Sequence, residues 1–181
     1  MIHILKQVKE SLPTLIISHV DTIKTMYIDY HKPYVSRMWF QLGDHRVFLH
    51  KIESCLTSKD ALFHPHKWES AMEILSGKYE MGVGYSETND IPKTACKLIL
   101  NTGSIYEMTE PNAWHYVNPT NDSCYTLMVT GKLNGRQMPV EPDKDKVFRK
   151  LSYLEIHDIL NCIDFHASID IYTLALKIAQ N

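Results

Sequence analysis

The sequence has no basic run and no long apolar run. Its 181 residues include 19 Lys and Arg against 21 Asp and Glu, which gives a formal net charge of −2 at pH 7. Proteins that bind nucleic acid usually carry a basic patch or a motif such as a helix-turn-helix, and this sequence shows neither. A transmembrane helix needs about 20 consecutive apolar residues, and no stretch approaches that length. We therefore expect neither nucleic acid nor a membrane as a partner.

Cysteine is also sparse and follows no motif. Cys55, Cys96, Cys124 and Cys162 are scattered along the chain without a CxxC pair. This spacing indicates buried thiols of a reducing compartment rather than a disulfide framework. The first residues, 1–13, mix charged and apolar side chains too closely for a secretory signal. The expected location is therefore cytoplasmic.

What remains is the ordinary composition of a globular protein, 44% hydrophobic and 22% charged. The length suits one domain, and we interpret residues 1–181 as such. The hydrophobic pattern divides the chain into a helical segment (1–37), a β-rich segment (38–133) and a second helical segment (134–181). The β-rich segment holds eight or nine short runs without helices between them. This pattern predicts a mainly β sandwich or barrel flanked by helices.

Both flanking segments show helical periodicity. Between residues 8 and 30, apolar residues recur every three or four positions, which predicts one or two short helices interrupted near Pro13. Ser152 and Glu155 form a capping-box pattern that predicts the start of a C-terminal helix. Two apolar stripes follow, which we expect to pack on the β core, with a partner surface as the alternative. The stripes consist of Ile156, Leu160 and Ile163, and of Ile171, Leu174 and Ile178.

The most informative stretch is residues 63–77, FHPHKWESAMEILSG. It places His64 and His66 two residues apart, so in an extended backbone both side chains point to the same face. His115 occurs later in a similar turn-to-strand setting. Three imidazoles on one face would make a transition-metal site. The alternative is that these are strand or surface histidines without a ligand role.

The same residues resemble the first signature motif of the cupin superfamily. In that family the motif reads HxH, three or four residues, a glutamate, six residues and a glycine. Here His64, His66 and Gly77 fit this spacing, but Ser70 occupies the glutamate position. By strand alternation Ser70 faces the same side as the histidines, and Glu69 faces outward unless a bulge turns it.

The second cupin motif is matched less closely. The stretch EPNAWHYVN places a turn at residues 111–113 before His115, one residue shorter than in the family, and Asn118 comes one residue early. The resemblance covers residues 38–133 and implies a jelly-roll β-barrel, the double-stranded β-helix, with a metal inside it. Barrels of this family often pair edge to edge, which makes a homodimer one expectation.

The missing glutamate has a chemical consequence. Three neutral imidazoles leave the charge of a divalent cation uncompensated, so the site would bind an anion or hydroxide readily. Such a site suits Fe(II), Zn or Ni and suits Mg or Ca poorly.

Three-histidine iron is the arrangement of the cysteine and other thiol dioxygenases, which the chain resembles in part. These enzymes hold the substrate carboxylate with an arginine upstream of the HxH motif, and here Arg37 follows Tyr34 at a comparable distance. A guanidinium suits a carboxylate, although a structural salt bridge would also explain Arg37. Their Ser-x-His-x-Tyr strand is matched here only by residues 126–130, TLMVT, which puts thiol oxygenation in doubt.

These observations predict an Fe(II)-dependent oxygenase acting on a small carboxylate or thiol. The residues His64, His66 and His115 would hold the metal, and Arg37 would bind the substrate. Two alternatives remain, a sugar isomerase or epimerase and a non-enzymatic small-molecule-binding cupin. His45 and His50 flank the predicted turn at Gly43-Asp44 and are expected to be solvated or core histidines, with one of them lining the pocket as the alternative.

Overall fold

The protein is mainly β, as predicted, and its computed structural model describes residues 1–88, 90–133 and 138–181. No described helix is long and apolar enough to cross a membrane. The elements are α1 (Ile2–Ser18), β1 (Lys24–Ile28), β2 (Val35–Leu42), β3 (His45–Glu53), β4 (His64–Pro65), β5 (Trp68–Ser76), β6 (Lys78–Tyr85), β7 (Cys96–Asn101), β8 (Ile105–Met108), β9 (Ala113–Pro119), β10 (Ser123–Leu133), α2 (Tyr153–Leu160) and α3 (Ile171–Ala179).

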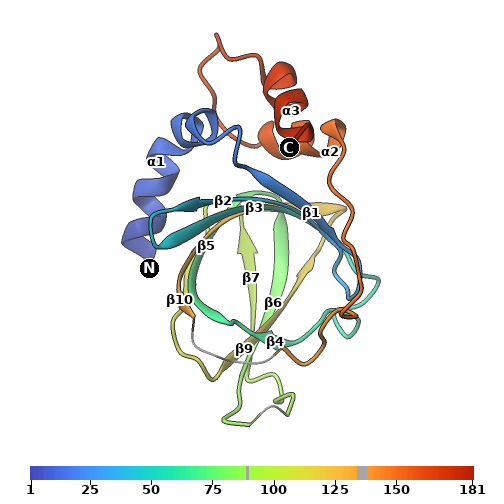
Figure 1. The fold of residues 1–181 in the computed structure, drawn as a ribbon. Coiled ribbons are helices and arrows are strands. Elements are labelled where there is room, and N and C mark those ends of the chain that lie inside the picture. The colour runs from blue at the N-terminus through green and yellow to red at the C-terminus, as the bar shows by residue number, and fades with distance from the viewer. Residues whose placement is uncertain (89, 134–137) are drawn as a thin grey trace.

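The strands form two antiparallel sheets that face each other (Figure 1). The larger sheet has the strand order β1-β2-β3-β10-β5-β8, and the smaller one has the order β4-β9-β6-β7. In the described part of the chain the two hydrogen-bonded ladders stay separate, so the barrel is not closed. The arrangement is the jelly-roll type that the sequence predicts.

Glycines at the predicted turns have the backbone conformation that such turns require. Gly43 has φ +57° between β2 and β3, and Gly77 has φ +92° between β5 and β6. A side chain rarely adopts a positive φ, whereas glycine does so at little cost. Both predicted turns are therefore confirmed.

The helical prediction for residues 1–37 is wrong in its second half. The helix α1 ends at Ser18, and strands β1 and β2 begin within this segment. Pro13 lies inside α1 without interrupting it, because burial of Leu12 and Ile16 holds the helix on the sheet. In the C-terminal segment, residues 134–137 lie outside the described part of the chain.

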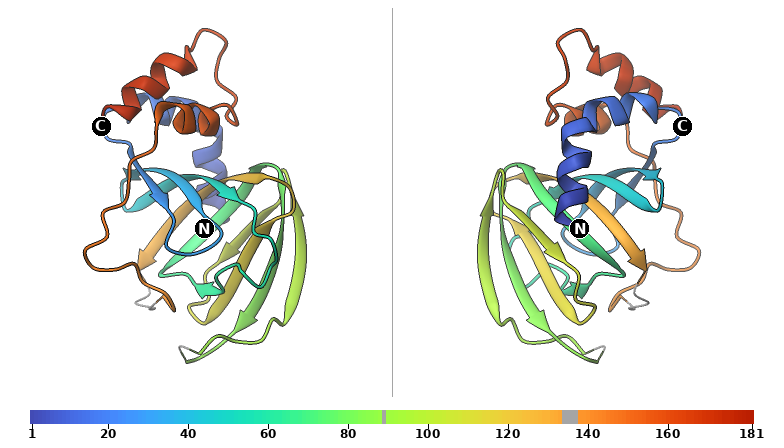
Figure 2. Two further views of the ribbon diagram at one scale, coloured as in Figure 1. Left: turned by 90° about the vertical axis from the view of Figure 1, so that its right-hand side faces the viewer. Right: turned by 90° about the vertical axis from the view of Figure 1, so that its left-hand side faces the viewer.

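The large sheet is buried on both faces. Along β10, Leu127 and Val129 point into the core shared with the helices, whereas Met128 and Thr130 line a cavity between the two sheets. Figure 2 shows α1 lying across the outer face of this sheet. The alternation that gives a strand two faces therefore separates a structural layer from a cavity layer.

The C-terminal helices pack on the β core as predicted. Ile156, Leu160, Ile163 and Ile178 are buried in the same cluster as the outer face of the large sheet. Cys55 and Cys124 are buried as expected, but Cys96 is exposed on β7. That expectation was wrong because β7 is the outermost strand of the small sheet.

The predicted capping box is present at the start of α2. The Ser152 hydroxyl accepts from the Glu155 backbone N–H, and the Glu155 carboxylate accepts from the Ser152 backbone N–H. Arg149 donates to both oxygens of Glu155, at 2.8 and 2.7 Å. This hydrogen bonding, from Arg149 above all, lowers the pKa of Glu155 from 4.5 to about 2.

A lowered pKa means that Glu155 stabilises the fold when ionised. The contribution is complete above pH 4.5 and is lost as the pH falls toward 2. We expect Glu155→Gln to lower the free energy of unfolding at pH 7 by about 1 kcal/mol. The deficit should shrink toward zero near pH 2, as measured by urea unfolding of both proteins across this range. A deficit that does not change with pH would show that the charge contributes nothing.

Candidate metal centre

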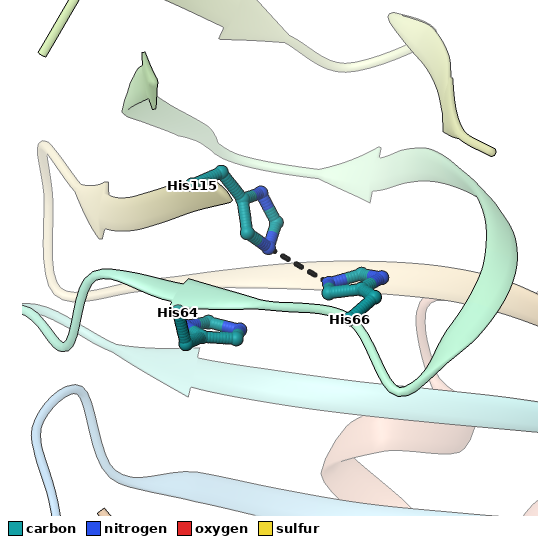
Figure 3. A group of neighbouring side chains, drawn as sticks. All are labelled: His64, His66 and His115. Atoms are coloured by element: carbon teal, nitrogen blue, oxygen red, sulfur yellow. Dashed lines mark hydrogen bonds between the residues drawn. The ribbon is translucent and has the colours of Figure 1, made fainter. Parts of the chain in front are cut away.

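The three predicted histidines come together on the inner face of the small sheet. His64 lies on β4 directly opposite His115 on β9, and His66 follows β4 by one residue. Pro65 fits between the two histidines because β4 is an edge strand, where a missing backbone N–H costs little. Figure 3 shows the three rings close together.

The spacing of the ring nitrogens is that of a metal site. One nitrogen from each ring lies within 4.8 Å of the other two, and within the described ranges these residues form the only such group. The Nε2 atoms of His66 and His115 are 2.8 Å apart. Two nitrogens bound about 2.0–2.1 Å from one metal at neighbouring positions lie roughly 3 Å apart. The rings therefore need little movement to share an ion.

Each ring is also held by a partner at its Nδ1 atom. Nδ1 of His64 is 2.9 Å from the Leu62 carbonyl oxygen, and Nδ1 of His66 contacts the Ser70 hydroxyl. Nδ1 of His115 lies 3.5 Å from the Met81 sulfur. When an ion replaces the hydrogen bond between Nε2 of His66 and Nε2 of His115, such contacts favour a proton on Nδ1 and leave Nε2 as the metal-binding atom. All three residues thus fit a divalent transition metal.

Burial keeps the three rings neutral. It lowers the pKa of His64 to about 4 and that of His66 to about 3. The pKa of His115 falls well below its ordinary value for the same reason. Neutral imidazole is the form that binds a metal, so the cluster is in its ligand form at pH 7.

Ser70 replaces the expected glutamate in position but not in role. Its side chain is 1% exposed and contacts His66, so it would orient a metal ligand rather than serve as one. Glu69 is absent from the described lining of the cavity. The pairing of β10 with β5 is irregular beside Glu69, but this does not bring its side chain into the described lining, so three imidazoles are the candidate ligand set.

Removing the Ser70 hydroxyl should weaken metal binding without abolishing it. Outer hydrogen-bond partners of metal ligands typically contribute about 10- to 100-fold in affinity, so we expect a loss in that range for Ser70→Ala. Competition with a chelator of known affinity measures it. Ser168→Ala, at an exposed serine, is the matched control and should change nothing. Equal affinity in both variants would reduce Ser70 to a packing role.

The histidines face a cavity of about 230 Å³ between the sheets. Arg37 lies on the opposite wall, where its Nε donates to Nε2 of His50 at 3.1 Å. Because His50 accepts there, its proton lies on Nδ1, which is 3.2 Å from the Thr126 hydroxyl. The histidine therefore positions Arg37, and the hydroxyl of Thr126 holds the histidine.

Arg37 brings a positive charge that no described carboxylate pairs with. Burial lowers its pKa to about 10, so it stays protonated at pH 7. Glu141, the one acid among the described lining residues, binds Lys67 at 2.7 Å. The cavity therefore combines neutral imidazoles with one uncompensated cation, which favours an anionic ligand.

His50 is buried and lines the cavity, which is the alternative that the sequence analysis left open for His45 or His50. The signal was present in the predicted turn. A two-residue turn at Gly43-Asp44 pairs Leu42 with His45. Each step back along β2 is matched by one step forward along β3, so Arg37 pairs with His50. The turn alone places Arg37 opposite His50.

Two tyrosines complete the inner wall. The Tyr79 hydroxyl donates to the Tyr106 hydroxyl at 2.8 Å, and Tyr106 donates to the Met72 sulfur at 3.1 Å. Burial raises the pKa of both phenols well above the ordinary value. Both therefore stay protonated and serve as hydrogen-bond donors rather than bases.

The two antiparallel sheets face each other, and the HxH histidines and His115 on β9 point inward. This arrangement matches the pattern expected from the cupin resemblance. The fold is cupin-like.

No family model matches the sequence, and no curated protein matches it. Among solved structures, hydroxypropylphosphonic acid epoxidase from S. wedmorenis aligns over 59% of this chain and 55% of its own, with 16% identity and a TM-score of 0.45.

Two further solved structures give similar values. A crystal structure of Fe(II) HppE aligns over 59% of this chain and 55% of its own, with 17% identity and a TM-score of 0.46. The cupin domain of Schizosaccharomyces pombe Cnp3 aligns over 54% and 63%, with 9% identity and a TM-score of 0.40. This chain thus covers little more than half the length of the hydroxypropylphosphonic acid epoxidase chain and of the Fe(II) HppE chain.

Proposed function

We propose that this protein is an Fe(II)-dependent oxygenase acting on a small carboxylate or thiol. The observation that carries the proposal is the pairing of two groups across one cavity. Three imidazoles with held Nδ1 atoms lie on one wall, and a protonated guanidinium without a carboxylate partner among the described residues lies on the other. Bound Fe(II) would supply the chemistry of O₂ activation at its open positions.

The chain's own residues would bind and orient the substrate. Arg37 would hold a carboxylate through its outer nitrogens, because its Nε is engaged by His50. Met72 and Met128 on the wall would exclude water from the reacting end. To donate a hydrogen bond to an oxygen of the ligand, the phenol of Tyr106 would have to turn its single O–H away from the Met72 sulfur, to which it donates in this structure.

An isomerase working in this cavity would have to use His31 or one of the three clustered imidazoles as its base. Such an enzyme needs a general base. Here the phenols are protonated, Glu141 is paired with Lys67, and Nε2 of His50 accepts from Arg37. A cupin that binds a small anion without turnover remains the alternative.

Two measurements on anaerobically purified protein test the proposal. Elemental analysis gives the bound metal, and an oxygen electrode follows O₂ uptake with a panel of small carboxylates and thiols. Near-stoichiometric iron together with compound-dependent uptake is the expected result. Bound iron without uptake would favour the binding alternative. Absence of metal after reconstitution with Fe(II) would overturn the proposal.

Arg37→Gln should raise KM for carboxylate substrates and leave the metal content unchanged. A hydrogen bond to a charged group contributes about 1.5–3 kcal/mol, so the expected rise is roughly 10- to 100-fold. The control is Arg46→Gln, since Arg46 is not among the described lining residues and its guanidinium lies over Trp39 and over Trp68, the second of which does line the cavity. Steady-state kinetics with the compound found by the screen measures the effect. An equal rise in both variants would argue against a carboxylate contact at Arg37.

A further inference from the structure

The cavity that holds the histidines reaches the free edges of both sheets. The strand β1 is one end of the large sheet, and β4 is one end of the small sheet. Ile28 on β1 and His64 on β4 both line the cavity. Because the two described ladders do not join at these edges, side chains from irregular segments complete the wall there.

Residues 138–150 form such a segment, which we call the strap. The structure describes it throughout, and it contains neither helix nor strand. Figure 1 shows it in orange, running up the side of the barrel toward α2. Met138 and Glu141, in its first part, line the cavity. The strap is therefore part of the cavity wall.

The second part of the strap is anchored beside β1. The backbone N–H of Tyr27 donates to the Arg149 carbonyl oxygen at 3.0 Å. Nζ of Lys146 lies 2.5 Å from a carboxylate oxygen of Asp29, the residue after β1. A backbone hydrogen bond and an ion pair thus hold this part of the strap to the edge of the large sheet.

The first part of the strap is tied to the other sheet by one described ion pair. Nζ of Lys67, just beyond β4, lies 2.7 Å from Oε1 of Glu141. The two side chains are 30% and 52% exposed, so water and salt weaken their attraction. Pro139 and Pro142 flank Glu141 and bring no backbone N–H, which leaves the attachment largely to side chains.

We propose that residues 138–142 are a gate to the histidine cavity and that the Lys67–Glu141 ion pair is its latch. When the pair separates, Met138 and Glu141 leave the wall and a small ligand can enter, while the anchored second part stays in place. An exposed ion pair is weak, which suits a contact that has to open repeatedly. The inference holds for any ligand of the cavity and does not depend on the proposed oxygenase.

Acylation of a cavity histidine in the metal-free chain measures how often the gate opens. Diethyl pyrocarbonate is a small neutral reagent that acylates imidazole, and peptide mass spectrometry gives its rate at His115, which is 2% exposed. Glu141→Lys places two ammonium groups at the latch. We expect acylation about fivefold faster, because losing an exposed pair and adding repulsion each shift an equilibrium a few-fold. Added salt should raise the rate in the wild type and lower it in the variant.

Exchanging the two charges separates the latch from a general loss of stability. Glu141→Lys/Lys67→Glu restores the attraction with its signs reversed, so the rate should return to within about twofold of the wild type. Lys6→Glu, which reverses an exposed charge on α1, is the control and should leave the rate unchanged. Equal rates in all four proteins, or a double variant as fast as Glu141→Lys, would overturn the proposal.

The methyl resonance of Met138 gives a second readout that needs no reagent. In the closed form this side chain shares the cavity wall with the aromatic rings of Tyr30 and Trp68, which displace the resonance from its value in an unfolded chain. Glu141→Lys should move it toward that value, and the charge exchange should move it back. A resonance that is the same in all these proteins would show a fixed wall and contradict the gate.

Discussion

His66→Ala should reduce the bound metal from near one ion per chain to none detectable. Of the imidazoles that line the described cavity, only three lie close enough together to share an ion, and the one lining carboxylate is engaged by Lys67. Losing one ligand leaves two, so the expected drop in affinity exceeds the roughly 100-fold typical of outer partners. Elemental analysis after anaerobic purification measures the loss.

The matched control for this result is His166→Ala, at an exposed histidine beyond α2. It should retain the metal in full. Thermal unfolding gives an independent readout, because a ligand that binds only the folded state raises Tm. Added Fe(II) should raise Tm in the control and not in His66→Ala. Equal metal content in the two variants would mean that the ion lies elsewhere.

Leu127→Ala should produce the largest loss of stability, about 3 kcal/mol within the usual range of about 2–5 kcal/mol. Leu127 is fully buried on β10, the strand that pairs with both β3 and β5. It points toward the helices, so the void would form in the layer that holds α1 and α2 on the sheet. Urea unfolding monitored by fluorescence measures the change.

The same variant tests whether the two faces of the sheet are independent. Metal content of the folded Leu127→Ala protein should equal that of the wild type, because the substituted side chain points away from the histidines. Ile99→Ala, on the exposed face of β7, should cost less than about 0.5 kcal/mol. A loss of metal in Leu127→Ala would show that packing beneath the helices controls the site.

The β core was readable from the sequence because local signals agree with the final pairing. Short alternating runs separated by glycine turns predict β2, β3, β5 and β6, and the turn glycines do have positive φ. The HxH spacing likewise predicts two imidazoles on one face, because strand alternation is a property of the backbone alone. His115 was predicted from its turn-to-strand setting and from the resemblance to the second cupin motif.

Features that depend on how elements pack together were not readable. The strand β1 was assigned to a helix because its five residues continue an apolar periodicity, and only pairing with β2 makes them a strand. Ser70 as the partner of His66 needs the turn between β4 and β5. The exposure of Cys96 needs the strand order, which one sequence does not fix.

The shortness of β4 has a consequence for local motion. A strand of two residues at the edge of its sheet has few backbone hydrogen bonds to keep it in place, so this edge should open far more often than the centre of the sheet. An ion shared by His64, His66 and His115 would join β4 to β9 as a crosslink does and restrict the opened forms. Amide hydrogen exchange near β4 would then report occupancy directly, slow in loaded molecules and fast in empty ones.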